Sequence, residues 1–252
     1  MINKLQINDN LVLFQDSESL PFGTDAYLLY AFAKCATKEN ACEFGSGTGI
    51  ISLLSMNKNK FKHMTMFEVQ KSLFDLSQKN VIENKLEEKI DAYNLNIKDI
   101  PTSFNNSFGV ILSNPPYVKL NTGFSKLDES NELCCKEVNG TIADFVKSAS
   151  RLLKNKGAFY CVYRPDRLNA LLVALSKNKL EPKRITFVYP YINSSPRLVL
   201  CESRKMGSEG LFITKPLVIY KDKKANQSDE NYTDDMKYIY DKGEFDNEYR
   251  NP

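Results

Sequence analysis

Short apolar runs alternate along the chain with stretches that have helical spacing. Seven runs rich in β-branched or aromatic residues predict buried strands. These runs lie at residues 41–44, 64–67, 90–95, 109–112, 158–163, 185–189 and 197–201. Regular alternation with helical segments predicts an α/β fold with a doubly wound, mostly parallel sheet of seven strands. The last two strands have no helix between them, so we expect an antiparallel strand at one edge of the sheet.

Two further stretches have strand character outside this alternation. Residues 5–14 alternate loosely and are interrupted by the polar residues 8–10. This pattern predicts a small hairpin, which forms an N-terminal extension over residues 1–20. Residues 211–220 predict one more hairpin arm beside the sheet.

The composition changes beyond Tyr220, where the chain becomes polar and acidic. The whole chain has a net charge of +3, and residues 221–252 carry six Lys or Arg and nine Asp or Glu. The tail therefore contributes −3 and residues 1–220 contribute +6, which is compatible with an RNA partner. We expect one domain over 1–220, followed by a tail with a short helix at 233–240 and a disordered last dozen residues.

Composition also narrows the class of protein. Apolar residues make up 42% and charged residues 26% of the chain, which is usual for a soluble globular protein. No apolar run approaches the roughly 20 residues that span a membrane, and no apolar signal region follows Met1. We therefore expect a cytoplasmic protein without a membrane partner, and a monomer. The six cysteines lack CxxC spacing and His63 is the only histidine, so we predict reduced thiols and no metal site.

A glycine-rich loop follows the first predicted strand of the sheet. The pattern Glu43-x-Gly45-x-Gly47-x-Gly49 leads from the strand into a helix that begins at Ile50. Such an arrangement lets the backbone approach a nucleoside cofactor closely. The dinucleotide-binding pattern requires its third glycine at the position of Ile50, so the spacing argues against that class. The loop instead looks like the S-adenosylmethionine loop of class I methyltransferases.

Two acidic residues near predicted element ends are candidate ligand contacts. Glu68 ends the second predicted strand, where an acid can accept hydrogen bonds from both ribose hydroxyls of a nucleoside. A surface Glu at a strand end is the alternative interpretation. Thr24 and Asp25 precede an apolar run at 26–32, and either is a natural N-cap for a helix there. That capping role holds for Asp25 whether or not it also contacts a ligand.

The fourth predicted strand ends abruptly at Asn114-Pro115-Pro116-Tyr117. Two prolines cannot donate to a sheet and each fixes its φ, so the turn is rigid. It brings together a side-chain amide, the Pro115 carbonyl and the Tyr117 ring. These groups suit a planar amine, with two acceptors for its hydrogens and a ring to stack on. By itself, the same turn also fits a plain strand ending. Residues 118–140 lack periodicity and predict a lid or substrate-recognition loop.

The glycine loop, Glu68 and the turn at 114–117, in this order, look like an amino-methyltransferase. The ends of strands one and four flank the topological switch point of such a sheet. At family level, the chain resembles the bacterial methyltransferases that make N6-methyladenosine beside the anticodon of valine tRNA. The resemblance runs from about residue 5 to Tyr240 and is carried by FGTDA (22–26), EFGSGTG (43–49), NPPY (114–117), YRPDRL (163–168) and LEPKR (180–184).

This resemblance implies a Rossmann-like class I methyltransferase that uses S-adenosyl-L-methionine to methylate an adenosine of tRNA at N6. It assigns the target amine to Asn114, Pro115 and Tyr117. The cofactor-binding residues that it implies are Asp25, Glu43, Gly45, Gly47, Gly49, Glu68, Asn96 and Asn114.

The chain departs from the family pattern at two places. Family members usually carry an acid where this chain has Asn96, which predicts weaker cofactor affinity rather than inactivity. They usually read Arg-His-Glu where this chain has Cys135-Lys136-Glu137. The absence of this arginine affects the expected RNA target more than the expected methyl-transfer chemistry.

Other functions fit parts of the pattern. The same turn occurs in enzymes that methylate a glutamine side chain of peptide release factors, because a carboxamide is also a planar amine. Those enzymes usually carry a separate N-terminal helical domain, for which the short stretch before Phe22 leaves no room. A catalytically weak RNA-binding paralogue is supported by Asn96 and opposed by the intact Asn114 and Glu68. Methylation of DNA adenine would require a target-recognition domain, which we do not find in the sequence.

Overall fold

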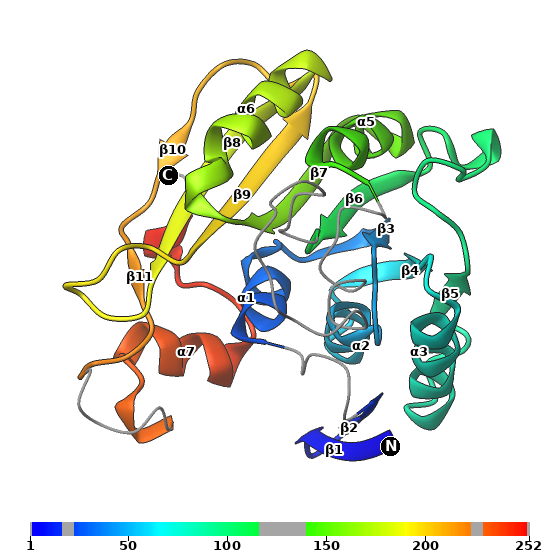
Figure 1. Ribbon diagram of the computed structural model, residues 1–252, viewed down its shortest axis with the longest axis horizontal. Helices are drawn as coiled ribbons and strands as arrows, with labels where there is room; N and C mark the ends of the chain where they lie inside the picture. Colours follow the sequence, from blue (N-terminus) through cyan, green and yellow to red (C-terminus); the bar gives the residue numbers. More distant parts are fainter. Residues whose placement is uncertain (1, 17–22, 116–139, 223–228, 251–252) are drawn as a thin grey trace, which may run out of the picture.

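A central β-sheet organises the computed structural model, which describes residues 2–16, 23–115, 140–222 and 229–250 (Figure 1). The sheet has nine strands in the order β10-β8-β9-β7-β6-β3-β4-β5, and β11 also pairs with β8. The strands are β3 (Ala36–Phe44), β4 (Phe61–Phe67), β5 (Ile90–Tyr93), β6 (Phe108–Ser113), β7 (Leu153–Tyr163), β8 (Leu180–Tyr189), β9 (Leu198–Lys205), β10 (Phe212–Ile213) and β11 (Leu217–Val218).

The predicted doubly wound α/β fold is confirmed. Strands β3 to β7 run parallel, and the seven predicted strands are all present. The antiparallel strand is β9, which pairs with both β7 and β8 and therefore lies inside the sheet, two positions in from β10 at the edge. The predicted extra hairpin arm is wrong, because β10 and β11 each pair with β8 in parallel. A parallel neighbour needs a chain crossover rather than a hairpin turn.

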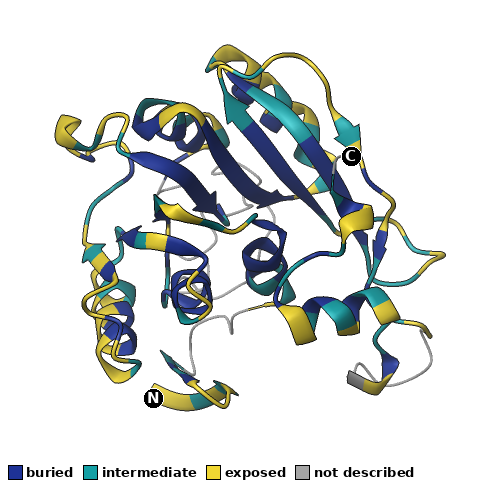
Figure 2. Ribbon diagram, turned by 180° about the vertical axis from the view of Figure 1, so that it is seen from behind, coloured by how far each residue is buried: buried dark blue, intermediate teal, exposed yellow. Residues whose placement is uncertain are grey.

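Helices cover both faces of the sheet. Figure 1 shows α1, α2 and α3 on one face and α5 and α6 on the other. Figure 2 shows the strands buried between these layers, with exposed residues on the outer helical surfaces. The helices are α1 (Thr24–Phe32), α2 (Ile50–Asn57), α3 (Lys71–Glu83), α5 (Ile142–Leu152), α6 (Leu168–Lys177) and α7 (Asp234–Lys242), with 3₁₀ turns at Thr102–Phe104, Pro165–Arg167, Asp229–Asn231 and Asn247–Tyr249. In the described part of the chain, no helix is long and apolar enough to cross a membrane.

The predicted N-terminal hairpin is present as β1 (Ile2–Asn8) and β2 (Leu11–Asp16). It is fastened to α3 by two asparagine side chains. Asn80 accepts from the backbone N–H of Phe14 at 2.6 Å, and Asn84 donates to the carbonyl of Val12 at 2.8 Å. Each asparagine pairs with a strand backbone as another strand would, so the hairpin edge is satisfied.

The C-terminal segment packs on the body of the protein. The short helix predicted at 233–240 is confirmed as α7, and its Met236 and Ile239 are buried in the core that covers α1 and α2. Phe245 and Tyr249 are buried in the same core. The predicted disorder of the last dozen residues is therefore wrong as far as Arg250. Apolar side chains spaced among charged ones gain burial here because they dock on an existing face.

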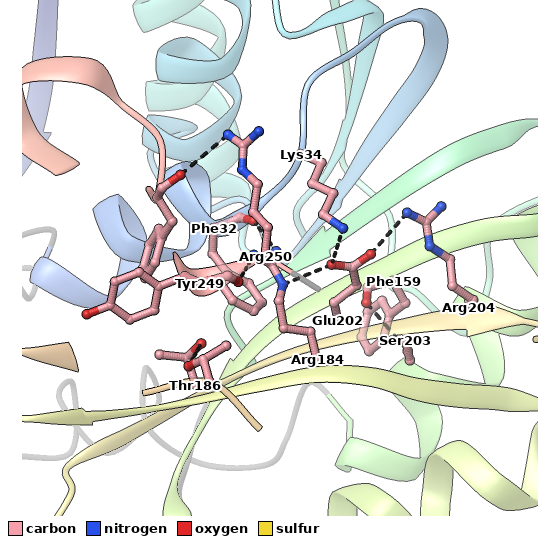
Figure 3. Close-up of polar contacts among 12 residues, drawn as sticks. Phe32, Lys34, Phe159, Arg184, Thr186, Glu202, Ser203, Arg204, Tyr249 and Arg250 are labelled. Atoms are coloured by element: carbon pink, nitrogen blue, oxygen red, sulfur yellow. Dashed lines mark hydrogen bonds and ion pairs between the residues drawn. The ribbon is translucent and has the colours of Figure 1, made fainter. Parts of the chain in front are cut away.

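A buried arginine connects this segment to α1 and the sheet (Figure 3). Arg184 on β8 donates to the carbonyl of Tyr249 at 2.9 Å, to the carbonyl of Phe32 at 2.7 Å and to Glu202 at 3.1 Å. Its guanidinium also lies 3.8 Å from the centre of the Phe32 ring. Lys34 and Arg204 lie on the other sides of Glu202, at 3.7 and 3.0 Å. Arg184 thus joins the end of α1 and the segment at Tyr249 to β8.

Candidate functional site

Three neighbouring strands bring the predicted site residues together at the edge of the sheet formed by their carboxyl ends. Phe44 of β3 lies opposite Phe67 of β4 on one side and opposite Ser113 of β6 on the other. The residues that come next, Gly45, Glu68 and Asn114, therefore emerge side by side. The chain continues from β3 to β4 on one side of the sheet and from β6 to β7 on the other side, so the strand order reverses between β3 and β6. The carboxyl ends of these two strands therefore flank the topological switch point, where ligands bind in such folds.

The glycine loop makes a tight turn between β3 and α2. Its first N–H groups, those of Gly45 and Ser46, donate to the carbonyl of Phe67 at 2.9 and 3.2 Å. Gly47 has a φ of +55°, and a Cβ there would meet no other atom within 4 Å. Gly49 has a φ of +84°, and a Cβ would lie 3.2 Å from the Met66 sulfur. The loop thus needs glycine for its backbone and leaves room beside Gly47 for a ligand.

Glu68 holds the loop and the start of α3 together. Its Oε2 accepts from the Gly47 N–H at 2.8 Å, and its Oε1 accepts from the Gln70 N–H at 2.9 Å. The residue is 5% exposed, and burial raises the pKa of its carboxyl despite these hydrogen bonds. A carboxylate has further lone pairs on both oxygens, so Glu68 can still accept from a ligand hydroxyl.

The loop also contains a buried polar group that suits a ligand. The hydroxyl of Ser46 is buried and has no hydrogen-bond partner among the described residues. A buried hydroxyl without a partner costs free energy, which a bound polar molecule would recover. Together with the space beside Gly47 and the acceptors of Glu68, this fits the nucleoside and amino-acid groups of S-adenosylmethionine.

Residues after β5 border the same edge. The side chain of Asn96 accepts from the Lys98 N–H at 3.0 Å, which makes a local turn. Asn94, which no sequence pattern marks as a site residue, donates to the carbonyls of Glu68 and Val69 at 2.8 and 3.0 Å. Asn94 therefore fixes the position of Glu68, and Asn96 follows two residues later in its own turn.

Asn114 begins the turn after β6 and contacts α1. Its side-chain nitrogen donates to Asp25 Oδ2 at 2.9 Å, and the next residue, Pro115, is buried. The predicted N-cap of α1 is wrong, because the helix is capped by Gly23 without a side-chain bond. The Asp25 carboxylate turns instead to Ala26 N–H and Asn114. Tyr117 and nearly all of the predicted lid at 118–140 lie outside the described residues.

Comparison with known proteins decides the family. Residues 17–172, more than half of the chain, match the model of the methyltransferase small domain. The chain belongs to the methyltransferase small domain family. The family resemblance predicted from the sequence is also confirmed. This methyltransferase is 27% identical over 206 residues to the tRNA1(Val) (adenine(37)-N6)-methyltransferase of a Flavobacteriaceae bacterium (strain 3519-10), and the match covers 80% of this chain and 86% of that protein.

Solved structures place this methyltransferase in the class I fold. A protein of Agrobacterium tumefaciens described as a predicted O-methyltransferase superposes with a TM-score of 0.68 at 16% identity, covering 87% of this chain and 96% of that one. TYW2 of P. horikoshii, solved in complex with MeSAdo, superposes with a TM-score of 0.58 at 16% identity, covering 82% and 72%. Family and fold confirm the prediction of S-adenosylmethionine as the cofactor.

The acid of the glycine motif, Glu43, is buried within β3. Glu43 is 1% exposed, and its Oε2 accepts from both the backbone N–H and the hydroxyl of Ser52 in α2. Burial raises the pKa of Glu43 to about 8, against the effect of these hydrogen bonds. We propose that Glu43 supports the glycine loop of the methyltransferase from the core side and does not touch the cofactor.

Glu43→Gln is expected to remove part of the pH dependence of stability. The folded state keeps the Glu43 proton up to a pH of about 8, whereas the unfolded chain loses it near its usual pKa of about 4.3. The free energy of unfolding therefore falls between pH 5 and 7 by on the order of 1.4 kcal/mol per pH unit, and the glutamine variant lacks this loss. Urea unfolding of both proteins at the two pH values measures the difference. Equal pH slopes would contradict the raised pKa.

Glu68→Gln is expected to weaken S-adenosylmethionine binding by about 10- to 100-fold, the usual value of one or two hydrogen bonds to a charged group. The glutamine keeps the shape but replaces an acceptor oxygen with an NH₂ group, which faces the Gly47 or Gln70 N–H or the ligand hydroxyls. Calorimetric titration measures the affinity, with Glu88→Gln, an exposed acid beyond α3, as the matched control. An unchanged affinity would remove Glu68 from the cofactor site.

Proposed function

We propose that this methyltransferase transfers the methyl group of S-adenosylmethionine to N6 of an adenosine in tRNA. The observation that carries the proposal is the position of Asn114. It follows β6 at Ser113, directly opposite Phe44, which leads into the glycine loop. The side-chain amide of Asn114 therefore lies beside the loop that fits the methyl donor.

The chemistry requires little beyond correct placement. The exocyclic nitrogen of adenine is a weak nucleophile because its lone pair is delocalised into the ring. Hydrogen bonds from that amine to Asn114 Oδ1 and the Pro115 carbonyl would favour a pyramidal nitrogen, whose lone pair can attack. Tyr117 would stack on the base and orient it. The sulfonium cofactor supplies a methyl group that is already activated.

Bond changes and proton movement follow from this arrangement. A nitrogen–carbon bond forms as the carbon–sulfur bond breaks in line, and the amine loses one proton. Asn114 Oδ1 and the Pro115 carbonyl would accept hydrogen bonds from the amine, and the released proton passes to solvent after methyl transfer. Holding both reactants in line supplies on the order of 7–11 kcal/mol of the barrier reduction. A base within folded RNA must first be unstacked and swung into the site.

Two observations support tRNA as the substrate. The relative described above is named for adenine-37 of valine tRNA. The +6 charge of residues 1–220 favours a polyanion. We accordingly propose the adenosine beside the anticodon of valine tRNA as the target, and a cytoplasmic location, where tRNA is found.

The test incubates the protein with radiolabelled S-adenosylmethionine and total tRNA from a strain that lacks the gene. The RNA is then digested to nucleosides and separated. We expect the label in N6-methyladenosine. A parallel reaction contains a peptide release factor as the acceptor. Label in that protein, with none in N6-methyladenosine, would contradict the proposal and favour glutamine methylation. Cofactor binding without transfer to any acceptor would indicate a catalytically weak RNA-binding paralogue.

A further inference from the structure

Asp25 and Asn114 are 89 residues apart in the chain and form a direct hydrogen bond at the site. The Asn114 side-chain nitrogen donates to Asp25 Oδ2 at 2.9 Å. The other carboxylate oxygen, Oδ1, accepts from the Ala26 N–H, also at 2.9 Å. Both oxygens of Asp25 are therefore fixed, one by the first turn of α1 and one by Asn114.

The shape of the chain before α1 makes room for this carboxylate. A Cβ on Gly23 would lie 2.5 Å from Asp25 Oδ1, closer than two such atoms approach. Gly23 is the N-cap of α1 and has an ordinary negative φ of −98°. Glycine at this position therefore leaves space for the carboxylate where it lies, and no special backbone conformation is involved. The positive end of the α1 dipole further favours a carboxylate in the first turn.

A carboxylate as partner decides which way the asparagine amide points. A carboxylate accepts hydrogen bonds and donates none, so the NH₂ group of Asn114 must face Asp25. The amide is planar, and its oxygen therefore points to the other side. An amine to be methylated has hydrogens to donate and needs that oxygen. With the amide turned over, its NH₂ group would meet the hydrogens of the substrate amine.

We propose that Asp25 is a positioning residue, which holds the Asn114 amide with its oxygen toward the substrate amine. This inference rests on the proposed function, because it assumes an amine at Asn114. It replaces the direct cofactor contact that the sequence predicted for Asp25. Asp25 acts through Asn114 and does not itself touch the reacting atoms.

Helix α1 is held firmly enough to serve as the support. The Tyr27 hydroxyl donates to the Tyr240 carbonyl at 3.0 Å. At the other end of the helix, Lys60 Nζ donates to the Tyr30 carbonyl at 2.7 Å, and Arg184 donates to that of Phe32 at 2.7 Å. These contacts come from the C-terminal segment, the residue before β4, and β8. The position of Asp25 is thus set by a helix that is anchored along its length.

The test exchanges the two polar groups. Asp25→Asn lets the Asn114 amide adopt either orientation, so we expect kcat to fall about 10- to 100-fold, the usual cost of a misplaced group. The affinity for S-adenosylmethionine, measured by calorimetry, should stay within a few-fold. Asn114→Asp places two carboxylates together and should be worse. The double variant Asp25→Asn with Asn114→Asp restores one donor facing a carboxylate, and should recover at least about tenfold over Asn114→Asp.

A structural readout accompanies the kinetics. The side-chain amide signals of Asn114 in heteronuclear NMR should shift in Asp25→Asn, and should not shift in Asp99→Asn, an exposed acid used as the control. Unchanged amide signals would overturn the inference, whatever the substrate proves to be. A tenfold loss of cofactor affinity at unchanged kcat would overturn it too, as would a double variant no better than Asn114→Asp. Failure of the proposed function would instead appear as the absence of N6-methyladenosine with the wild-type protein.

Discussion

Asn114→Ala is expected to lower kcat for methyl transfer by at least about 100-fold, as does the loss of a group that acts on the transition state. The side chain offers the amine an acceptor, and its hydrogen bond with Asp25 at 2.9 Å keeps the amide in one orientation. Alanine removes both features and leaves the glycine loop and Glu68 in place. The affinity for S-adenosylmethionine should therefore change only a few-fold. Single-turnover transfer and calorimetric binding, measured on the same preparation, separate the two effects.

The control for this substitution is Asn169→Ala, which removes an exposed asparagine from α6 on the opposite face of the sheet. It should leave both transfer and binding unchanged. Equal activity of Asn114→Ala and the wild-type protein would remove Asn114 from the reaction. A loss of cofactor affinity as large as the loss of transfer would make it a binding residue only.

Arg184→Met is expected to lower the free energy of unfolding by about 3–5 kcal/mol, the usual cost of removing one partner from a buried ion pair. The change leaves the carbonyls of Tyr249 and Phe32 without their donor and leaves Glu202, which is 2% exposed, with Lys34 and Arg204 alone. The C-terminal segment then loses its attachment to β8. Urea unfolding measures the loss, and limited proteolysis should cut the segment from Thr233 to Arg250 first.

A gentler variant and a control accompany this prediction. Arg184→Lys keeps the charge but cannot reach three acceptors, so its loss of stability should lie between wild type and Arg184→Met. Arg197→Met replaces an exposed arginine before β9 and should change stability little. An Arg184→Met protein as stable and as resistant to protease as wild type would show that the buried network adds nothing to the fold.

Local patterns in the sequence were enough for most of the fold and for the candidate residues that the strands bring together. The strands, the glycine loop and the turn after β6 depend on residues close together in the chain, so spacing alone identifies Gly45, Glu68 and Asn114. The parallel order of the strands then places these residues at one edge. The Ser46 hydroxyl, by contrast, has no local signal, because its burial depends on the packing around the loop.

Contacts between distant residues are where the sequence predictions failed. Asp25 resembled a helix cap because its neighbours are those of a helix start, and only its distance to Asn114 reveals its other partner. The C-terminal segment resembled a disordered tail because its few apolar residues, such as Tyr249, stand among charges. It contacts Arg184, an ordinary strand arginine in sequence whose partners lie up to 152 positions away. A charge is buried only where such partners converge.

The central claim is that this protein methylates adenosine in tRNA at the site formed by the glycine loop and Asn114. Its most direct test is the amount of N6-methyladenosine in tRNA from cells that lack the gene, measured by mass spectrometry of nucleosides. Wild-type protein supplied to these cells should restore the modified nucleoside, and Asn114→Ala should not. Modified nucleoside that persists without the gene, or that Asn114→Ala restores fully, would contradict the account.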